Sequence, residues 1–120
     1  MEDFVDSPDT DDGLDMDAVT IVSHRDGSTG VVVLAGELDL HGRHRLESAI
    51  EALVANGADC ISVEAEDLTF IDSSGLAALL LAKARVEGAG GTFRLGQVTN
   101  AVTRVIELAD VSDLLGPGAD

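Results

Sequence analysis

Short apolar runs and polar turns alternate along the first third of the chain. Residues 19–23, VTIVS, alternate apolar and polar positions as a half-buried strand does. Residues 30–35, GVVVLA, form a continuous β-branched run, which indicates a strand covered on both faces. Residues 24–30, HRDGSTG, are rich in turn formers. The two runs and their short connection therefore predict a β-hairpin.

The remainder of the chain alternates between helical and strand patterns. Apolar residues recur at spacings of three and four in three segments, which predicts helices at residues 43–55, 74–87 and 101–108. Asn56-Gly57 is a helix stop signal, and Thr99 is placed to cap the last helix. Two more strands are predicted between the helices, at residues 59–65 and 92–96.

The predicted order is β-β-α-β-α-β-α. Helices that connect strands imply parallel neighbours joined by right-handed crossovers, and the leading hairpin adds an antiparallel pair. The fold class expected is therefore α/β, a small mixed β-sheet with packed helices. At 120 residues the length fits one domain, which we place at residues 18–116. Residues 1–17 are expected to form an acidic disordered tail, and residues 117–120 a short C-terminal tail.

Composition narrows the function classes. Hydrophobic residues make up 45% of the chain, with no Trp or Tyr and three Phe, so the core is expected to consist of Val, Leu, Ile and Ala. The single Cys60 excludes an internal disulfide and a Cys-rich zinc site. The formal net charge of -16, with eight of the 23 acids in residues 1–17, disfavours nucleic acid as a partner. The absence of a membrane-length apolar run and of a basic N-terminus predicts a cytoplasmic protein with no membrane association.

The segment Asp72-Ser73-Ser74-Gly75 lies where a strand is predicted to pass into a helix. One interpretation is a helix cap, because an Asp or Ser side chain accepting a free backbone N–H contributes about 1 kcal/mol. The other is a hydroxyl presented for modification, because the N-terminus of a helix tolerates a phosphate group. The pattern leaves both open, and it does not decide between the hydroxyls of Ser73 and Ser74.

Catalytic, metal and cofactor sites are not expected. A nucleophilic Ser73 would need a base within reach, and the histidines His24, His41 and His44 lie in a turn and near one helix start. The G-x-S-x-G elbow of hydrolases and the phosphate-binding P-loop are both absent from the sequence. His41 and His44 stand near Glu37 and Asp39, but no second group of ligands completes a metal site.

Two motifs together resemble a known family. The segments GELDLHGRHRL (residues 36–46) and DLTFIDSSGLAAL (residues 67–79) are similar to those of bacterial anti-sigma-factor antagonists, which have the STAS domain fold. The resemblance extends from about Val19 to Leu115. Members of the family usually continue with a further strand and helix where this sequence ends at Asp120, and the acidic tail also lies outside their pattern.

The resemblance implies a partner-switching module that is not an enzyme and carries no cofactor. In the unphosphorylated state such a module binds an anti-sigma factor, which is also a serine-protein kinase, and so frees a sigma factor for transcription. The kinase then phosphorylates the serine after the Asp, here Ser73, using its own ATP, and a phosphatase restores the free form. An acidic module of this kind suits a partner with a basic surface.

The predicted partner-binding residues are the switch and the preceding loop: Glu37, Asp39, Asp72, Ser73, Ser74 and Gly75. The alternative is a STAS scaffold or accessory subunit, either in a stress complex or in a lipid transporter. We expect a monomer or a weak dimer in either case.

Overall fold

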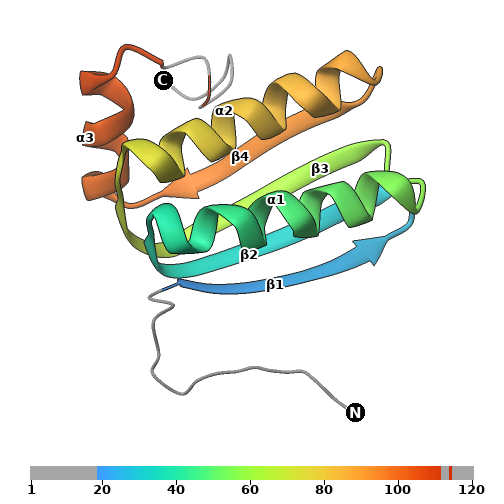
Figure 1. The fold of residues 1–120 in the computed structure, drawn as a ribbon, viewed down its shortest axis with the longest axis horizontal. Helices are drawn as coiled ribbons and strands as arrows, with labels where there is room; N and C mark the ends of the chain where they lie inside the picture. Colours follow the sequence, from blue (N-terminus) through green and yellow to red (C-terminus); the bar gives the residue numbers. More distant parts are fainter. Residues whose placement is uncertain (1–18, 112–113, 115–120) are drawn as a thin grey trace.

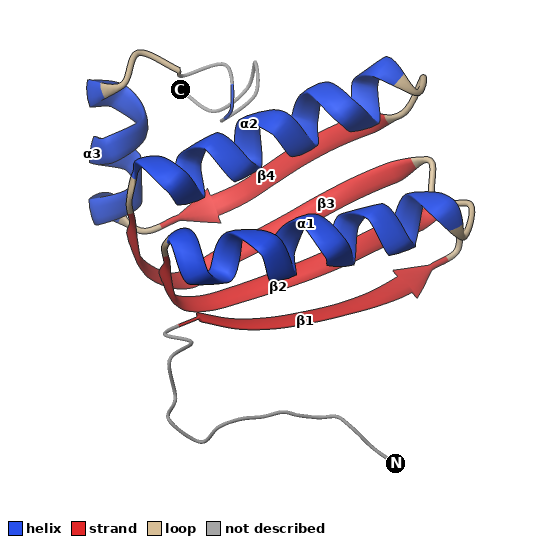
Figure 2. Cartoon of the chain, viewed as in Figure 1, coloured by secondary structure: helices blue, strands red, loops and turns tan. Residues whose placement is uncertain are grey.

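The computed structural model describes residues 19–111 and Leu114, which form the mixed α/β domain shown in Figures 1 and 2. The elements follow the predicted β-β-α-β-α-β-α order, so the expected fold class is confirmed. In chain order they are β1 (Val19–Asp26), β2 (Thr29–Leu38), α1 (Leu40–Ala55), β3 (Cys60–Ile71), α2 (Ser73–Gly88), β4 (Thr92–Val98) and α3 (Asn100–Leu108). The two predicted tails, residues 1–17 and 117–120, lie outside the described residues.

The four strands form one sheet in the order β1-β2-β3-β4. Strand β1 pairs antiparallel with β2, whereas β2, β3 and β4 are parallel neighbours, as the hairpin and the helical crossovers predict. Helices α1 and α2 lie side by side over one face of the sheet, and α3 lies at the end where the parallel strands finish (Figure 1). The parallel strands therefore direct their carboxyl ends toward the N-termini of α1 and α2.

The core lies between the sheet and the α1–α2 layer. Alternate residues of the strands point into it, including Val32 and Leu34 of β2 and Ile61 and Val63 of β3, all with no exposed surface. Outward-facing Val31, Val33 and Ala35 of β2 are only half-buried. The prediction that this strand is covered on both faces is therefore wrong for its outer face, because both long helices pack on the other one.

Several element boundaries differ from the predicted ones for identifiable reasons. Helix α1 begins at Leu40 rather than at residue 43, because Asp39 caps it. Strand β3 continues to Ile71 rather than ending at residue 65, and its register with β2 shifts after the Val33–Glu64 pair. That irregularity interrupts the simple alternation of apolar residues. Helix α3 ends at Leu108 as predicted, and Ala109 is its exposed C-cap.

Candidate functional site

The structure brings the two predicted segments together at one edge of the sheet. Strands β2 and β3 end side by side, with Glu37 paired to Phe70 and Leu38 paired to Ile71 in the parallel register. The backbone N–H of Asp72 donates to the Leu38 carbonyl at 3.2 Å, which links the two strand ends directly. Each strand then enters a helix through an aspartate. The six predicted residues thus lie on two neighbouring strand-to-helix junctions.

Each junction is closed by the aspartate side chain. Asp39 Oδ1 accepts hydrogen bonds from the backbone N–H groups of His41 at 3.0 Å and Gly42 at 3.2 Å. Asp72 Oδ1 accepts one from the N–H of Gly75 at 2.9 Å. These contacts satisfy N–H groups that a helix start leaves without a partner. The cap interpretation of the second junction is therefore correct, and the capping group is the Asp72 carboxylate.

Ser73 is left free of the cap and is exposed as the first residue of α2. Ser74, the second residue, is half-buried. Within the described residues, neither serine hydroxyl nor either serine backbone N–H makes a hydrogen bond. The start of a helix carries partial positive charge and free donors, which favours a negative group there. Of the two serines, Ser73 is the more exposed, and the side chain of neither forms the cap.

Gly75 holds this helix start close to strand β2. It is buried, and a Cβ atom at its position would lie 2.5 Å from the Leu38 carbonyl oxygen and 2.9 Å from Ile71 Cγ1. Only glycine fits this approach. Gly75 therefore positions the first turn of α2, and any influence it has on a partner is exerted through that backbone position.

Two large apolar side chains beside the junctions were not predicted from the sequence. Phe70, at the end of β3, is 47% exposed, and Leu40, the first residue of α1, is 55% exposed. Phe70 lies next to Glu37 across the strand pair. Exposed apolar groups beside charged ones are typical of protein contact surfaces. Phe70 stands two positions before the capping Asp72 and out of phase with the buried Ile71, and that position is the signal that could have identified it.

A nucleophilic serine would need a base within hydrogen-bond reach. His24 pairs with Val31 near the start of β2, at the opposite end of the sheet from Ser73. In the described part of the chain, none of the three histidines hydrogen-bonds to Ser73, and no three His, Cys, Asp or Glu side chains are grouped as a metal site would require.

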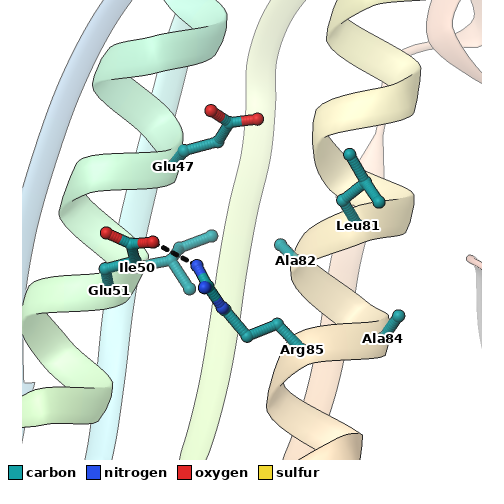
Figure 3. A pocket seen from close by; sticks show the side chains of 7 residues that line it. All are labelled: Glu47, Ile50, Glu51, Leu81, Ala82, Ala84 and Arg85. Carbon is teal, nitrogen blue, oxygen red and sulfur yellow. Dashed lines mark hydrogen bonds and ion pairs between the residues drawn. The ribbon is translucent and has the colours of Figure 1, made fainter.

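A hollow of about 500 Å³ lies elsewhere, between the helices α1 and α2 (Figure 3). An ion pair between Glu51 of α1 and Arg85 of α2 spans it. The lining residues of α2 lie between Leu81 and Arg85, about two turns beyond Ser73. This hollow is therefore separate from the edge that carries the predicted site.

Loss of the Asp72 cap has a measurable consequence. We expect Asp72→Ala to lower the free energy of unfolding by about 1 kcal/mol, because the N–H of Gly75 loses its acceptor. Asp72→Asn keeps an acceptor oxygen and should stay within a few tenths of a kcal/mol of the wild type. Urea denaturation followed by circular dichroism measures both. Equal losses in the two variants would contradict the assigned cap.

The comparisons with known proteins place the chain among domains of one kind. The family model described as "Mlab, STAS domain" matches residues 21–116. The anti-sigma-B factor antagonist of Bacillus subtilis (strain 168) is 25% identical over 84 residues, which cover 70% of this chain and 76% of that protein.

Solved structures agree with that match. The anti-sigma factor antagonist SpoIIAA in its unphosphorylated form superposes with a TM-score of 0.70 at 26% identity, over 79% of this chain and 84% of that one. A structure of the Bacillus SpoIIAA in the phosphorylated form gives a TM-score of 0.65 at 25% identity, over 79% and 87%. An anti-sigma factor antagonist from Mycobacterium paratuberculosis gives 0.72 at 24% identity, over 82% and 83%, and shows the shared fold.

None of the helices in residues 19–111 has the length and apolar character needed to cross a bilayer.

Proposed function

This chain belongs to the STAS domain family, and from that membership we propose that it is an anti-sigma-factor antagonist switched at Ser73. In its free form it binds an anti-sigma factor that is also a serine-protein kinase, and so releases a sigma factor. Phosphorylation of Ser73 ends the binding, and a phosphatase restores it. The proposed role is that of a cytoplasmic binding module in bacterial transcription control, with no catalytic activity and no contact with nucleic acid.

One observation carries this proposal: Ser73 is an exposed hydroxyl at the first position of a helix whose cap is supplied by another residue. A kinase can therefore transfer the γ-phosphoryl group of ATP to Ser73 Oγ, releasing ADP, while Asp72 continues to hold the helix start. The phosphate brings about -1.5 to -2 charges to a point that the fold tolerates. The fold is thus expected to survive the modification while the surface changes.

The surroundings of Ser73 support a protein contact there. Phe70 and Leu40 offer apolar area, and Glu37 and Asp39 offer carboxylates at the same edge of the sheet. We propose that the contact surface consists of these residues together with the switch segment Asp72–Gly75. A partner that packs closely against the small hydroxyl of the free form would meet a bulky, hydrated dianion in the phosphorylated form, which is an unfavourable element at the centre of the interface.

The alternative is a STAS scaffold or an accessory subunit in a stress complex or a lipid transporter. A scaffold or subunit of this kind would have the same fold but would not be reversibly phosphorylated at Ser73. Stable co-purification with an ATPase subunit, together with an unmodified Ser73 under all growth conditions, would favour it over the antagonist.

Mass spectrometry tests the proposed function. We expect the protein purified from its own cells to include a species heavier by one phosphate, removed by phosphatase treatment and located at Ser73 by fragmentation. Incubation with the co-purifying kinase and ATP should convert the wild type and Ser74→Ala to this species, whereas Ser73→Ala should stay unmodified. The reverse pattern would assign the switch to Ser74, and no phosphate in any condition would remove the switch altogether.

A further inference from the structure

Helix α1 begins with a group of basic side chains in an otherwise acidic chain. His41, Arg43, His44 and Arg45 lie within five successive positions, and we call them the α1 basic cluster. They are two of the seven Lys and Arg residues and two of the three His residues in a chain of net charge -16. The first turn of α1 contains no acidic residue, and the N-cap before it is the carboxylate of Asp39.

A helix N-terminus is an unfavourable place for positive charge, because the helix dipole is positive there. Among the described residues, Glu47 is the carboxylate that pairs with this cluster, at 3.0 Å from Arg43 Nε and 3.6 Å from His44 Nδ1. The side chain of His44 remains 79% exposed. The exposed side of the cluster, at His44, is therefore accessible to a further group.

A groove lies directly beside the cluster. It has a volume of about 470 Å³ and runs between β1 and α1, which lie alongside one another in Figure 1. Its lining combines two cluster residues with small and apolar ones: Ile21, Ser23, His44, Arg45, Ser48 and Ala49. Such a lining suits an extended segment that carries carboxylates and a few apolar side chains.

The chain enters the fold at the mouth of this groove. The carbonyl of Val19 accepts a hydrogen bond from Arg45 Nη1 at 3.0 Å. A Cβ atom on Gly42 would lie 2.5 Å from Val19 Cγ1, so β1 begins in close contact with the first turn of α1. Residues 1–18 are thus joined to the domain next to the α1 basic cluster.

The composition of residues 1–18 complements the groove. The sequence MEDFVDSPDTDDGLDMDA contains eight acids and no Lys, Arg or His. Its last part places Leu14 and Met16 between the acids Asp12, Asp15 and Asp17. Covalent attachment gives such a segment a local concentration of about a millimolar, which favours contacts that are weak individually.

We propose that residues 1–18 dock on the α1 basic cluster and in the groove between β1 and α1 of the same chain. The carboxylates of the segment lie against the α1 basic cluster, and Leu14 and Met16 lie against Ile21 and Ala49. This contact is independent of the proposed switching function, because it needs neither a partner nor a phosphate.

Paramagnetic relaxation in the full chain tests the docking. A nitroxide is attached at Ser7→Cys in a Cys60→Ser background. The heights of the amide peaks in the NMR spectrum are then compared with those of the same protein after its label has been reduced. The control carries the same label with the four acids of residues 11–17 changed to Asn. In the chain with the acidic segment, we expect the peaks of residues 21–23 and 44–49 to have about half the height that they have in the control, because charge draws the segment to the groove. Peaks of β4 should be equal in both.

Three further results decide the proposal. Docking predicts that the difference disappears in about 0.5 M salt, because charges are then screened over a few ångströms. It also predicts loss of the difference in Arg43→Gln/His44→Gln, but not in the control Arg94→Gln/Arg104→Gln. Identical amide peak heights in the chain with the acidic segment and in the chain with the neutral segment would overturn the proposal. Peak broadening that appears only when spin-labelled chains are mixed with isotope-enriched chains would also overturn the proposal. The groove would then be occupied by the segment of a second copy of the chain.

Discussion

Replacing Ser73 with Asp is expected to weaken binding of the anti-sigma factor by about 100-fold, or about 3 kcal/mol. The substitution places a permanent charge on the exposed first residue of α2, beside Phe70 and the Asp72 cap. The fold should be unaffected, because a helix N-terminus accepts a carboxylate and Ser73 makes no hydrogen bond within the described residues. Isothermal titration calorimetry with the purified partner measures the loss, and thermal unfolding checks the fold.

A matched control is available at the third helix. Asn100 is the exposed first residue of α3, as Ser73 is of α2, and its helix is likewise capped by the preceding residue, Thr99. Asn100→Asp adds the same charge at the junction of β4 and α3, which carries none of the proposed contact residues, and should leave the affinity within about twofold. Ser73→Ala should also bind normally, and ATP should fail to release it. Equal affinities for Ser73→Asp and the wild type would exclude Ser73 as the switch.

The sequence was sufficient to predict the order of elements because each one has its own periodic pattern. The β-branched run of β2 and the spacing of Leu46, Ile50 and Leu53 in α1 are local signals that tertiary contacts reinforce. Gly42 shows where such signals fail. The predicted helix begins after Gly42, at residue 43, whereas the structure places Gly42 inside α1, where the absence of a side chain lets Val19 of β1 approach.

Strand β3 shows a second kind of failure. Ile61, Val63 and Ala65 alternate regularly, but the next buried residues are Leu68 and Ile71. The register with β2 shifts in this stretch, so the alternation changes phase although the strand continues. A pattern with a period of two cannot detect a strand across such an irregularity. As a result, the sequence located Asp72 correctly but did not reveal that Phe70 is displayed beside it.

At the candidate site, the sequence placed Asp72 and Ser73 at a helix start but did not show what each side chain does there. Asp72 and Ser73 were both identified, but only the coordinates assign the cap to the carboxylate, through the 2.9 Å bond to the N–H of Gly75. That distinction depends on the direction of each side chain, which cannot be determined from the spacing of residues in the sequence. The roles of Glu37, Asp39 and Ser74 in binding a partner stay predictions.

Gly75 allows the first turn of α2 to lie close to the end of strand β2. We expect Gly75→Ala to lower the free energy of unfolding by about 3 kcal/mol, because the added methyl group would lie 2.5 Å from the Leu38 carbonyl oxygen. The contact is with backbone, so relief requires α2 to move away from β2. Such a movement also shifts Ser73, and partner binding should fall together with stability. Urea denaturation gives the first quantity and calorimetry the second.

The same substitution at the other end of α2 separates steric conflict from helix propensity. A Cβ atom on Gly88 would meet no atom within 4 Å, and Gly88 is the last residue of the helix. Gly88→Ala should therefore raise stability by about 0.5 to 1 kcal/mol, because alanine loses less conformational freedom than glycine on entering a helix. If Gly75→Ala were also stabilising, the start of α2 would not be packed against β2 as described. The glycine of the Asp-Ser-Ser-Gly segment would then have to be explained by contact with the partner itself.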